Sequence, residues 1–188
     1  MSDSRSVQEN VREVYDQVAG EAHGTGVAAH LYGQEELRWL PGDALCLALG
    51  LGNPTRWASL CAGERVLDLG CGAGIDSLLA ARVVGQGGRV FGLDMTPAML
   101  ERAETNARVL NLQNIEFLSG QIEAVPLPGE HVDAVISNGV INLCPEKKKV
   151  FSEAMRLLRP GGRLVFSDMV VAEDLPKEIR EDPAAWSG

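Results

Sequence analysis

Residues 65–77 read R-V-L-D-L-G-C-G-A-G-I-D-S, and residues 89–94 read R-V-F-G-L-D. The apolar residues on either side of Asp68 predict a short buried strand, and residues 75–84 predict a helix. The glycines between them permit a sharp turn and let a ligand approach the backbone closely. Strand, glycine turn, helix and second strand, in this order, are typical of a site for a nucleotide-like cofactor at the helix N-terminus.

The spacing of the glycines distinguishes between classes of cofactor. Gly70, Gly72 and Gly74 give G-x-G-x-G, whereas nicotinamide and flavin cofactors usually bind to G-x-G-x-x-G. Asp68, two residues before the first glycine, would crowd a pyrophosphate but suits a cofactor with a cationic, amine-bearing end. Asp94, at the tip of the second strand, can accept hydrogen bonds from two ribose hydroxyls. The alternative is a glycine-rich turn that binds nothing.

Composition limits the class of protein. The chain of 188 residues is long enough for one domain with a sizeable core. No apolar run approaches the ~20 residues that span a membrane, and the first ten residues lack the apolar part of a signal peptide. The net charge of −9 argues against a nucleic-acid partner. Four cysteines without C-x-x-C indicate a cytoplasmic protein, and the three histidines lack metal-ligand spacing.

Turn and cap signals predict the remaining elements. Ser6-x-x-Glu9 resembles a capping box for a helix to about Val18, and residues 20–33 are expected to form a loop. We expect short helices at 35–40 and between Asn53 and Gly63, strands at 65–69, 89–93, 115–118, 132–137 and 163–168, and longer helices at 75–84, 97–110 and 146–158. This alternation predicts a Rossmann-like α/β fold, doubly wound, with N-terminal helices before a mostly parallel sheet in the order 3-2-1-4-5.

The glycine motif with its two carboxylates resembles class I S-adenosylmethionine-dependent methyltransferases. Further segments are similar to arsenite methyltransferases: L-G-N-P (51–54), G-L-D-M-T-P-A-M-L (92–100), S-N-G-V-I-N-L (137–143), L-R-P-G-G-R-L (158–164), L-P-K-E-I-R (175–180) and W-S-G (186–188). The similarity covers nearly the whole chain from about Tyr15. It implies S-adenosyl-L-methionine as cofactor and methyl transfer to trivalent arsenic or another soft nucleophile.

The resemblance also implies which residues line the cofactor site: Tyr15, Asp68, Gly70, Cys71, Gly72, Gly74, Asp94, Met95, Ile122, Glu123 and Asn138. Asp68 would meet the amino-acid end and Asp94 the ribose. Met95 would lie against the adenine, with Ile122 and Glu123 at its edge, and Cys71 would present its backbone to the cofactor. The alternative for Met95 and Ile122 is core packing, and for Tyr15 it is an amphipathic helix position. No catalytic residue is assigned, since an acceptor with a free lone pair needs no general base.

The cysteines that hold arsenic in that family are missing here. Arsenite methyltransferases bind trivalent arsenic through thiolates, which are soft ligands for a soft centre. One cysteine takes the third place of S-N-C-V-I-N-L, which is Gly139 in this chain, and another takes the place of Leu51. A third follows W-S-G, where this chain stops at Gly188, and residues 22–25 replace the cysteines of the N-terminal loop. We therefore expect weak or absent arsenite methylation.

Three readings of the acceptor remain open. Cys144 and Cys46 are candidates to replace the missing arsenic ligands, although free cysteine commonly behaves as a small buried hydrophobe. The chain is alternatively a degenerate or truncated paralogue that binds the cofactor without arsenic turnover. It is also compatible with methylation of another small metabolite, such as a quinone.

The residues after the fifth predicted strand decide how the sheet is completed. We expect one methyltransferase domain, with a helical and lid segment at 1–62, a cofactor-binding core at 63–170 and a tail at 171–188. Class I methyltransferases usually add an antiparallel hairpin after the fifth strand, and only twenty residues follow Asp168 here. We expect the hairpin to be missing, so that the fifth strand is an edge that pairs in a homodimer or is covered by the tail.

Overall fold

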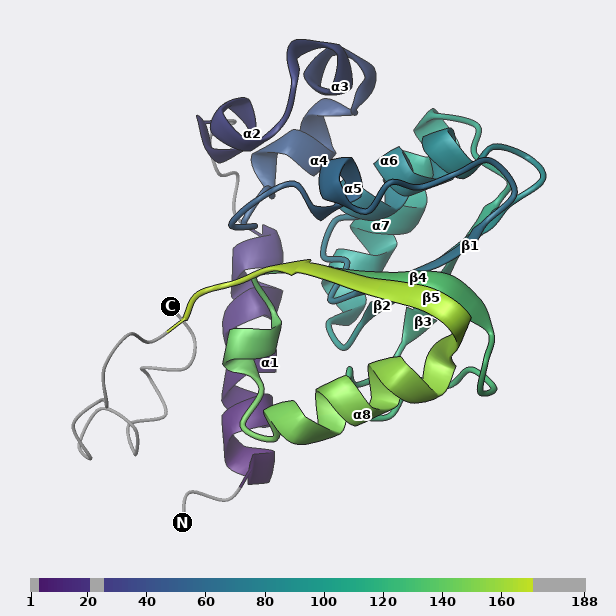
Figure 1. The fold of residues 1–188 in the computed structure, drawn as a ribbon. Helices are drawn as coiled ribbons and strands as arrows, with labels where there is room; N and C mark the ends of the chain where they lie inside the picture. The colour runs from purple at the N-terminus through teal and green to yellow at the C-terminus, as the bar shows by residue number, and fades with distance from the viewer. Residues whose placement is uncertain (1–3, 21–25, 171–188) are drawn as a thin grey trace.

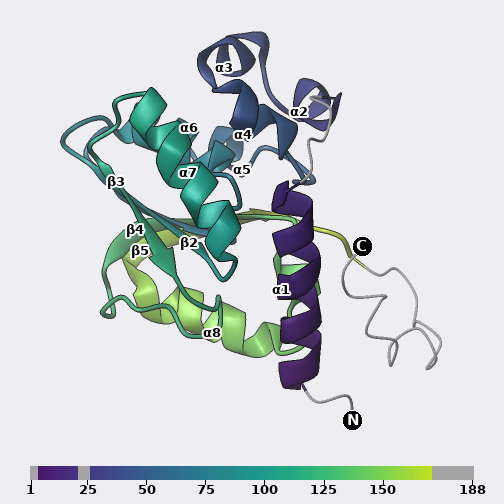
Figure 2. The same cartoon turned by 180° about the vertical axis from the view of Figure 1, so that it is seen from behind.

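The computed structural model describes residues 4–20 and 26–170, in which a five-stranded sheet lies between two layers of helices (Figures 1 and 2). Within these ranges no helix is long and apolar enough to cross a membrane. The elements are α1 (Ser4–Gly20), α2 (Gly26–Leu31), α3 (Gln34–Trp39), α4 (Gly42–Cys46), α5 (Pro54–Trp57), β1 (Arg65–Leu69), α6 (Ile75–Val84), β2 (Arg89–Asp94), α7 (Pro97–Val109), β3 (Ile115–Ser119), β4 (Val132–Asn138), the 3₁₀ helix η1 (Ile141–Leu143), α8 (Lys147–Leu157) and β5 (Leu158–Ser167).

The sheet has the predicted order β3-β2-β1-β4-β5, and every pairing is parallel. β1 lies in the centre, where Leu69 stands opposite Leu93 of β2 and Ser137 of β4. Parallel strands in this register end together, so the residues that follow them converge at one edge of the sheet. The Rossmann-like α/β fold expected from the sequence is confirmed.

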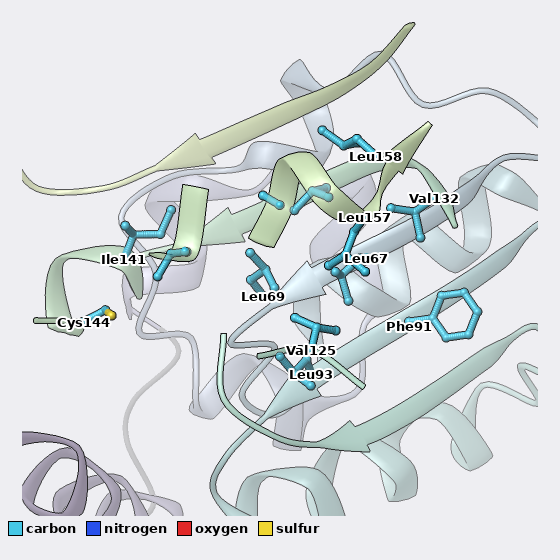
Figure 3. Close-up of a cluster of buried hydrophobic side chains, with 13 residues drawn as sticks. Leu67, Leu69, Phe91, Leu93, Val125, Val132, Ile141, Cys144, Leu157 and Leu158 are labelled. Atoms are coloured by element: carbon cyan, nitrogen blue, oxygen red, sulfur yellow. The ribbon is translucent and has the colours of Figure 1, made fainter. Parts of the chain in front are cut away.

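Each face of the sheet carries its own hydrophobic core. On one face, Leu67, Leu69 and Leu93 pack against α8, which contributes Leu157 (Figure 3). On the other face, Val66 and its neighbours in β2 and β4 pack against α6. Burial on both faces explains why the strand sequences are almost continuously apolar. These cores hold the strand ends in fixed positions.

The N-terminal region is more helical than expected. Residues 26–31 form α2, so the predicted loop at 20–33 is wrong for this part, and residues 21–25 lie outside the described residues. The fully buried Ala28 anchors this helix in the core. Asn53 caps α5 as predicted, by accepting a hydrogen bond from the backbone of Arg56, but the helix ends at Trp57. Burial in the tertiary structure therefore decides whether a segment that is too short to show a clear sequence period forms a helix.

β5 begins earlier than expected. It starts at Leu158 instead of residue 163, and its register against β4 shifts between Val132 and Ala134. The glycines of this segment allow the irregular pairing. Among the described residues no strand pairs with the outer side of β5, which is therefore the edge of the sheet within these ranges. The expected absence of a hairpin concerns the tail at 171–188, which lies outside the described residues.

Candidate functional site

A pocket lies where the carboxyl ends of β1, β2 and β4 meet, and α1 stands across this end of the sheet (Figures 1 and 2). Ten of the predicted site residues line it: Tyr15, Asp68, Gly70, Cys71, Gly72, Asp94, Met95, Ile122, Glu123 and Asn138. Gly74 does not line the pocket. It is the N-cap of α6, with φ of 94°, and packs against Ala103 of α7.

The glycine turn is fastened to the end of β2. The backbone nitrogens of Gly70 and Cys71 both donate hydrogen bonds to the carbonyl oxygen of Leu93, at 2.8 and 2.9 Å. Gly72 has φ of 51° and donates its backbone N–H to the Asp94 carboxylate, at 2.9 Å. A Cβ atom at Gly72 would meet no other atom within 4 Å. The turn therefore needs glycine for its left-handed backbone and leaves space beside it for a ligand.

Asp94 is held in position by backbone groups. One carboxylate oxygen accepts from Gly72 and the other accepts from the backbone N–H of Thr96, each at 2.9 Å. Burial raises the pKa of Asp94, although these hydrogen bonds act in the opposite direction. A carboxylate has about four lone-pair directions, so each oxygen retains the capacity to accept from a ligand hydroxyl.

Asp68 is a buried carboxyl group whose charged form is stabilised by few hydrogen-bond donors. It is only 2% exposed and accepts a hydrogen bond from the Ser77 hydroxyl at 2.6 Å. Burial, followed by the nearby charge of Asp76, raises the pKa of Asp68 to about 8. The described residues that line the pocket include no lysine, arginine or histidine. A cationic ligand would therefore relieve an unfavourable electrostatic arrangement in this pocket.

A second group of polar side chains joins α1 to the pocket. The Glu123 carboxylate accepts hydrogen bonds from Gln8 of α1 at 2.6 Å and from the Cys144 thiol at 2.8 Å. Tyr15, also on α1, is half-buried, and burial and then the charge of Asp94 raise its pKa. Gln8 was not singled out from the sequence, because nothing in its neighbourhood indicates that α1 covers the strand ends.

Asn138 borders the pocket, but its amide is occupied by the chain itself. Its side-chain oxygen accepts from the backbone nitrogens of Leu51 and Gly52, at 2.8 and 3.1 Å. Its side-chain nitrogen donates to the Gly52 carbonyl at 2.8 Å and to the Asp76 carboxylate at 2.9 Å. Both amide hydrogens therefore already have partners. Asp76 was missed by sequence reasoning, and a carboxylate in the first turn of the motif helix was the available signal.

The described residues contain no group of three or more histidine, cysteine, aspartate or glutamate side chains able to hold a metal ion. The pocket instead combines apolar side chains with buried carboxylates. Met95 and Ile122 line it from the ends of β2 and β3, and both positions have the side-chain types that pack against a flat apolar ring.

The raised pKa of Asp68 makes folding stability depend on pH. Its pKa is about 8 in the folded chain, against an ordinary value of 3.8, so the folded state retains a proton that the unfolded chain releases. This stabilisation is complete below about pH 4 and is lost as the pH rises through about 8. We expect the ligand-free protein to unfold at lower urea concentration at about pH 8 than at about pH 6. The Asp68→Asn variant should lose less stability over that interval, and an equal loss in both proteins would contradict this assignment.

Comparison with known proteins agrees with the geometry. The profile of the family described as "Methyltransferase domain" matches residues 60–188. An arsenite methyltransferase from Halobacterium salinarum is 47% identical over 146 residues, which cover 78% of this chain and 37% of that protein. The chain thus spans little more than a third of the length of this relative.

Two solved structures are also similar. An arsenic(III) S-adenosylmethionine methyltransferase from Chlamydomonas reinhardtii has a TM-score of 0.66 and 39% identity, covering 87% of this chain and 55% of that one. A SAM-dependent methyltransferase from Aquifex aeolicus has a TM-score of 0.60 and 25% identity, covering 77% and 78%. The resemblance to arsenite methyltransferases inferred from the motifs is confirmed. Because the family profile matches most of the chain, and the glycine turn and both carboxylates lie within the match, this chain belongs to the methyltransferase domain family.

Proposed function

We propose that this chain is the cofactor-binding part of an S-adenosylmethionine-dependent methyltransferase that acts on a small acceptor. The observation that carries the proposal is a pocket with buried carboxylates and no cation among its described lining residues. The cofactor has a cationic sulfonium and an ammonium group, which match this charge. When bound, it supplies an electrophilic methyl carbon, so the protein has to provide binding and alignment.

Each carboxylate has a role in this proposal. Asp68 would receive the ammonium group, because it is buried and lacks a cationic partner. Asp94 would accept from the ribose hydroxyls, since backbone hydrogen bonds already fix its orientation. Met95, Ile122 and Tyr15 would enclose the adenine. The core at 63–170 would then form the binding unit of one domain, with the N-terminal helices as its cover.

The chain would promote the reaction by positioning the acceptor against the methyl group of the cofactor. Apolar side chains, including Leu49 and Val140, line the pocket beside the strand ends and would exclude water from the reacting atoms. Alignment of an acceptor lone pair with the methyl–sulfur bond lowers the entropy cost of reaching the transition state. An acceptor with a free lone pair needs no general base. The acceptor is therefore proposed to be a small, soft nucleophile and not a nucleic acid.

A cytoplasmic location is part of the same proposal. All four cysteines carry free thiols in the structure. Free thiols persist where glutathione and thioredoxin keep cysteine reduced, which favours the cytoplasm over an oxidising compartment.

The geometry supports the expectation that this chain methylates arsenite weakly or not at all. A Cβ atom at Gly139 would lie 3.5 Å from the Leu51 side chain, so the two positions that carry cysteine in arsenite methyltransferases face each other here without a thiol. Cys144 lies in the pocket, but burial and the Glu123 carboxylate raise its pKa to about 12. Burial also raises the pKa of Cys71. Both thiols stay protonated at neutral pH, and the thiolate is the form that binds soft centres.

We expect S-adenosylhomocysteine to bind, and the Asp94→Ala variant to bind about 1–3 kcal/mol more weakly because it loses charge-assisted hydrogen bonds to the ribose. Calorimetry on both proteins measures this difference. The Asp133→Ala variant is the control, because that carboxylate lies at the opposite end of β4, where it contacts Arg159 and the backbone N–H of Arg65 at the start of β1. Equal affinity in wild type and Asp94→Ala, or a preference for NAD, would count against the proposal.

We expect little methylated arsenic from the unmodified chain when arsenite, S-adenosylmethionine and a thiol reductant are supplied. The double variant Leu51→Cys with Gly139→Cys should form more, because two thiols would then face each other. Gly139 has φ of 72°, so a side chain there is strained and the gain should be partial. Rapid turnover by the unmodified chain, abolished in Cys144→Ser, would overturn this expectation and identify Cys144 as the ligand.

The edge strand suggests a homodimer as a further part of the proposal. β5 exposes Phe166, which is 44% accessible and stacks edge-on against Phe151 of α8 at 5.7 Å between ring centroids. Unpaired strand edges with apolar side chains favour pairing between chains. Sedimentation should detect dimers that dissociate in the Phe166→Lys variant. A wild-type protein that remains monomeric at every concentration would rule out this pairing.

A further inference from the structure

One buried carboxylate that lines the pocket has no role in the proposed cofactor contacts. Asp76, in the first turn of α6, is 6% exposed. Its two oxygens accept from the Tyr32 hydroxyl at 3.2 and 3.1 Å, from the Thr55 hydroxyl at 3.3 Å and from the Asn138 amide at 2.9 Å. These donors come from the end of α2, from α5 and from β4. Asp76 is thus the common acceptor for three separate parts of the chain.

The amide of Asn138 transmits this contact to the backbone of residues 49–53. Its oxygen accepts from Leu51 and Gly52, while its nitrogen binds Asp76 and the Gly52 carbonyl. Rotation of the amide by half a turn would place its oxygen against Asp76 and against that carbonyl. The carboxylate therefore fixes which way the amide faces, and only that orientation satisfies the two backbone donors.

The packing of the segment 49–53 depends on the same amide. A Cβ atom at Gly50 would collide with the side chain of Asn138, and one at Gly52 would collide with the side chain of Ser167 at the end of β5. The segment thus lies directly on the carboxyl ends of β4 and β5. Leu49 and Gly50 line the pocket from this segment, next to Gly139.

We propose that Asp76 is a positioning residue that orients the Asn138 amide and thereby holds residues 49–53 as the wall against which the methyl acceptor is placed. This inference rests on the proposed methyl transfer, because it assigns the acceptor side of the same pocket. Asp76 acts through Asn138 and Tyr32 and does not itself contact the reacting atoms. The start of a helix is a favourable place for this charge, since the helix dipole stabilises an anion there.

Swapping the carboxylate and the amide between positions 76 and 138 tests whether Asp76 orients the Asn138 side chain. Asn138→Asp keeps acceptor oxygens for Leu51 and Gly52 but sets two carboxylates against each other. We expect hydrogen exchange at the amides of Leu51 and Gly52 to become about tenfold faster, as for the loss of one hydrogen bond. Adding Asp76→Asn restores an amide donor opposite a carboxylate. In that double variant the exchange should be slower than in Asn138→Asp alone by at least about threefold.

Further variants separate positioning from general destabilisation. Asp76→Ala should speed exchange at Leu51 and Gly52, Asp76→Asn should do so less because its amide oxygen still accepts, and Asp133→Ala should leave both rates unchanged. Exchange at Leu67 of β1 and Leu93 of β2 should stay slow in every variant that is folded. Unchanged rates at Leu51 and Gly52 in Asp76→Ala, or no recovery in the double variant, would overturn the proposal. If Asp76→Ala does not fold, the comparison of Asn138→Asp with the double variant still decides it.

Binding of S-adenosylhomocysteine distinguishes this inference from the proposed function. Its dissociation constant should change by less than about threefold in Asp76→Asn, because positioning of the acceptor wall adds no contact to the cofactor. A loss comparable to that of Asp94→Ala would show that Asp76 binds the cofactor, which contradicts the positioning role. Failure of the wild type to bind S-adenosylhomocysteine would refute the proposed function and, with it, the acceptor role of residues 49–53. The exchange rates, which are measured without ligand, would still decide whether Asp76 orients Asn138.

Discussion

Parallel pairing of β1 with both β2 and β4 is the constraint on which the site depends. The register places Leu69, Leu93 and Ser137 side by side, so three strands end at the same level. Asp94 then comes within hydrogen-bond distance of the glycine turn that follows β1. The cores on the two faces of the sheet fix this register, because a shift of one residue would move each side chain of a strand into the opposite core and disrupt the packing of both.

Convergence of strand ends concentrates carboxyl groups. Asp68 and Asp76 are buried and Asp94 is half-buried at or near this edge, and burial raises the pKa of each. Each carboxyl group is partly compensated by a different set of donors: the Ser77 hydroxyl for Asp68, side chains of the N-terminal region and Asn138 for Asp76, and backbone N–H groups for Asp94. Asp68 has the least compensation, which makes it the group that gains most from a cationic ligand.

The two sides of the pocket are built differently. On the cofactor side, Asp68 and the glycine turn are close together in the sequence, and the conformation of the turn depends on local backbone geometry. Tyr15, Asp94 and Ile122 join them from other elements. The acceptor side is assembled by long-range contacts, since Asn138 binds the backbone of Leu51 and Gly52 from the end of β4. Two cysteine positions of the arsenite methyltransferases fall in this second part, at Leu51 and Gly139.

The sequence by itself determined the sheet order, the glycine turn and the positions of Asp68 and Asp94, because buried parallel strands and left-handed glycines leave a local pattern. It did not determine α2, the early start of β5 or the fact that Gly74 packs against α7 outside the pocket. It also gave no indication that Tyr32, Asp76 and Asn138 meet. These residues are separated by 44 and 62 positions, and only the tertiary structure brings their donors and acceptors within hydrogen-bond distance.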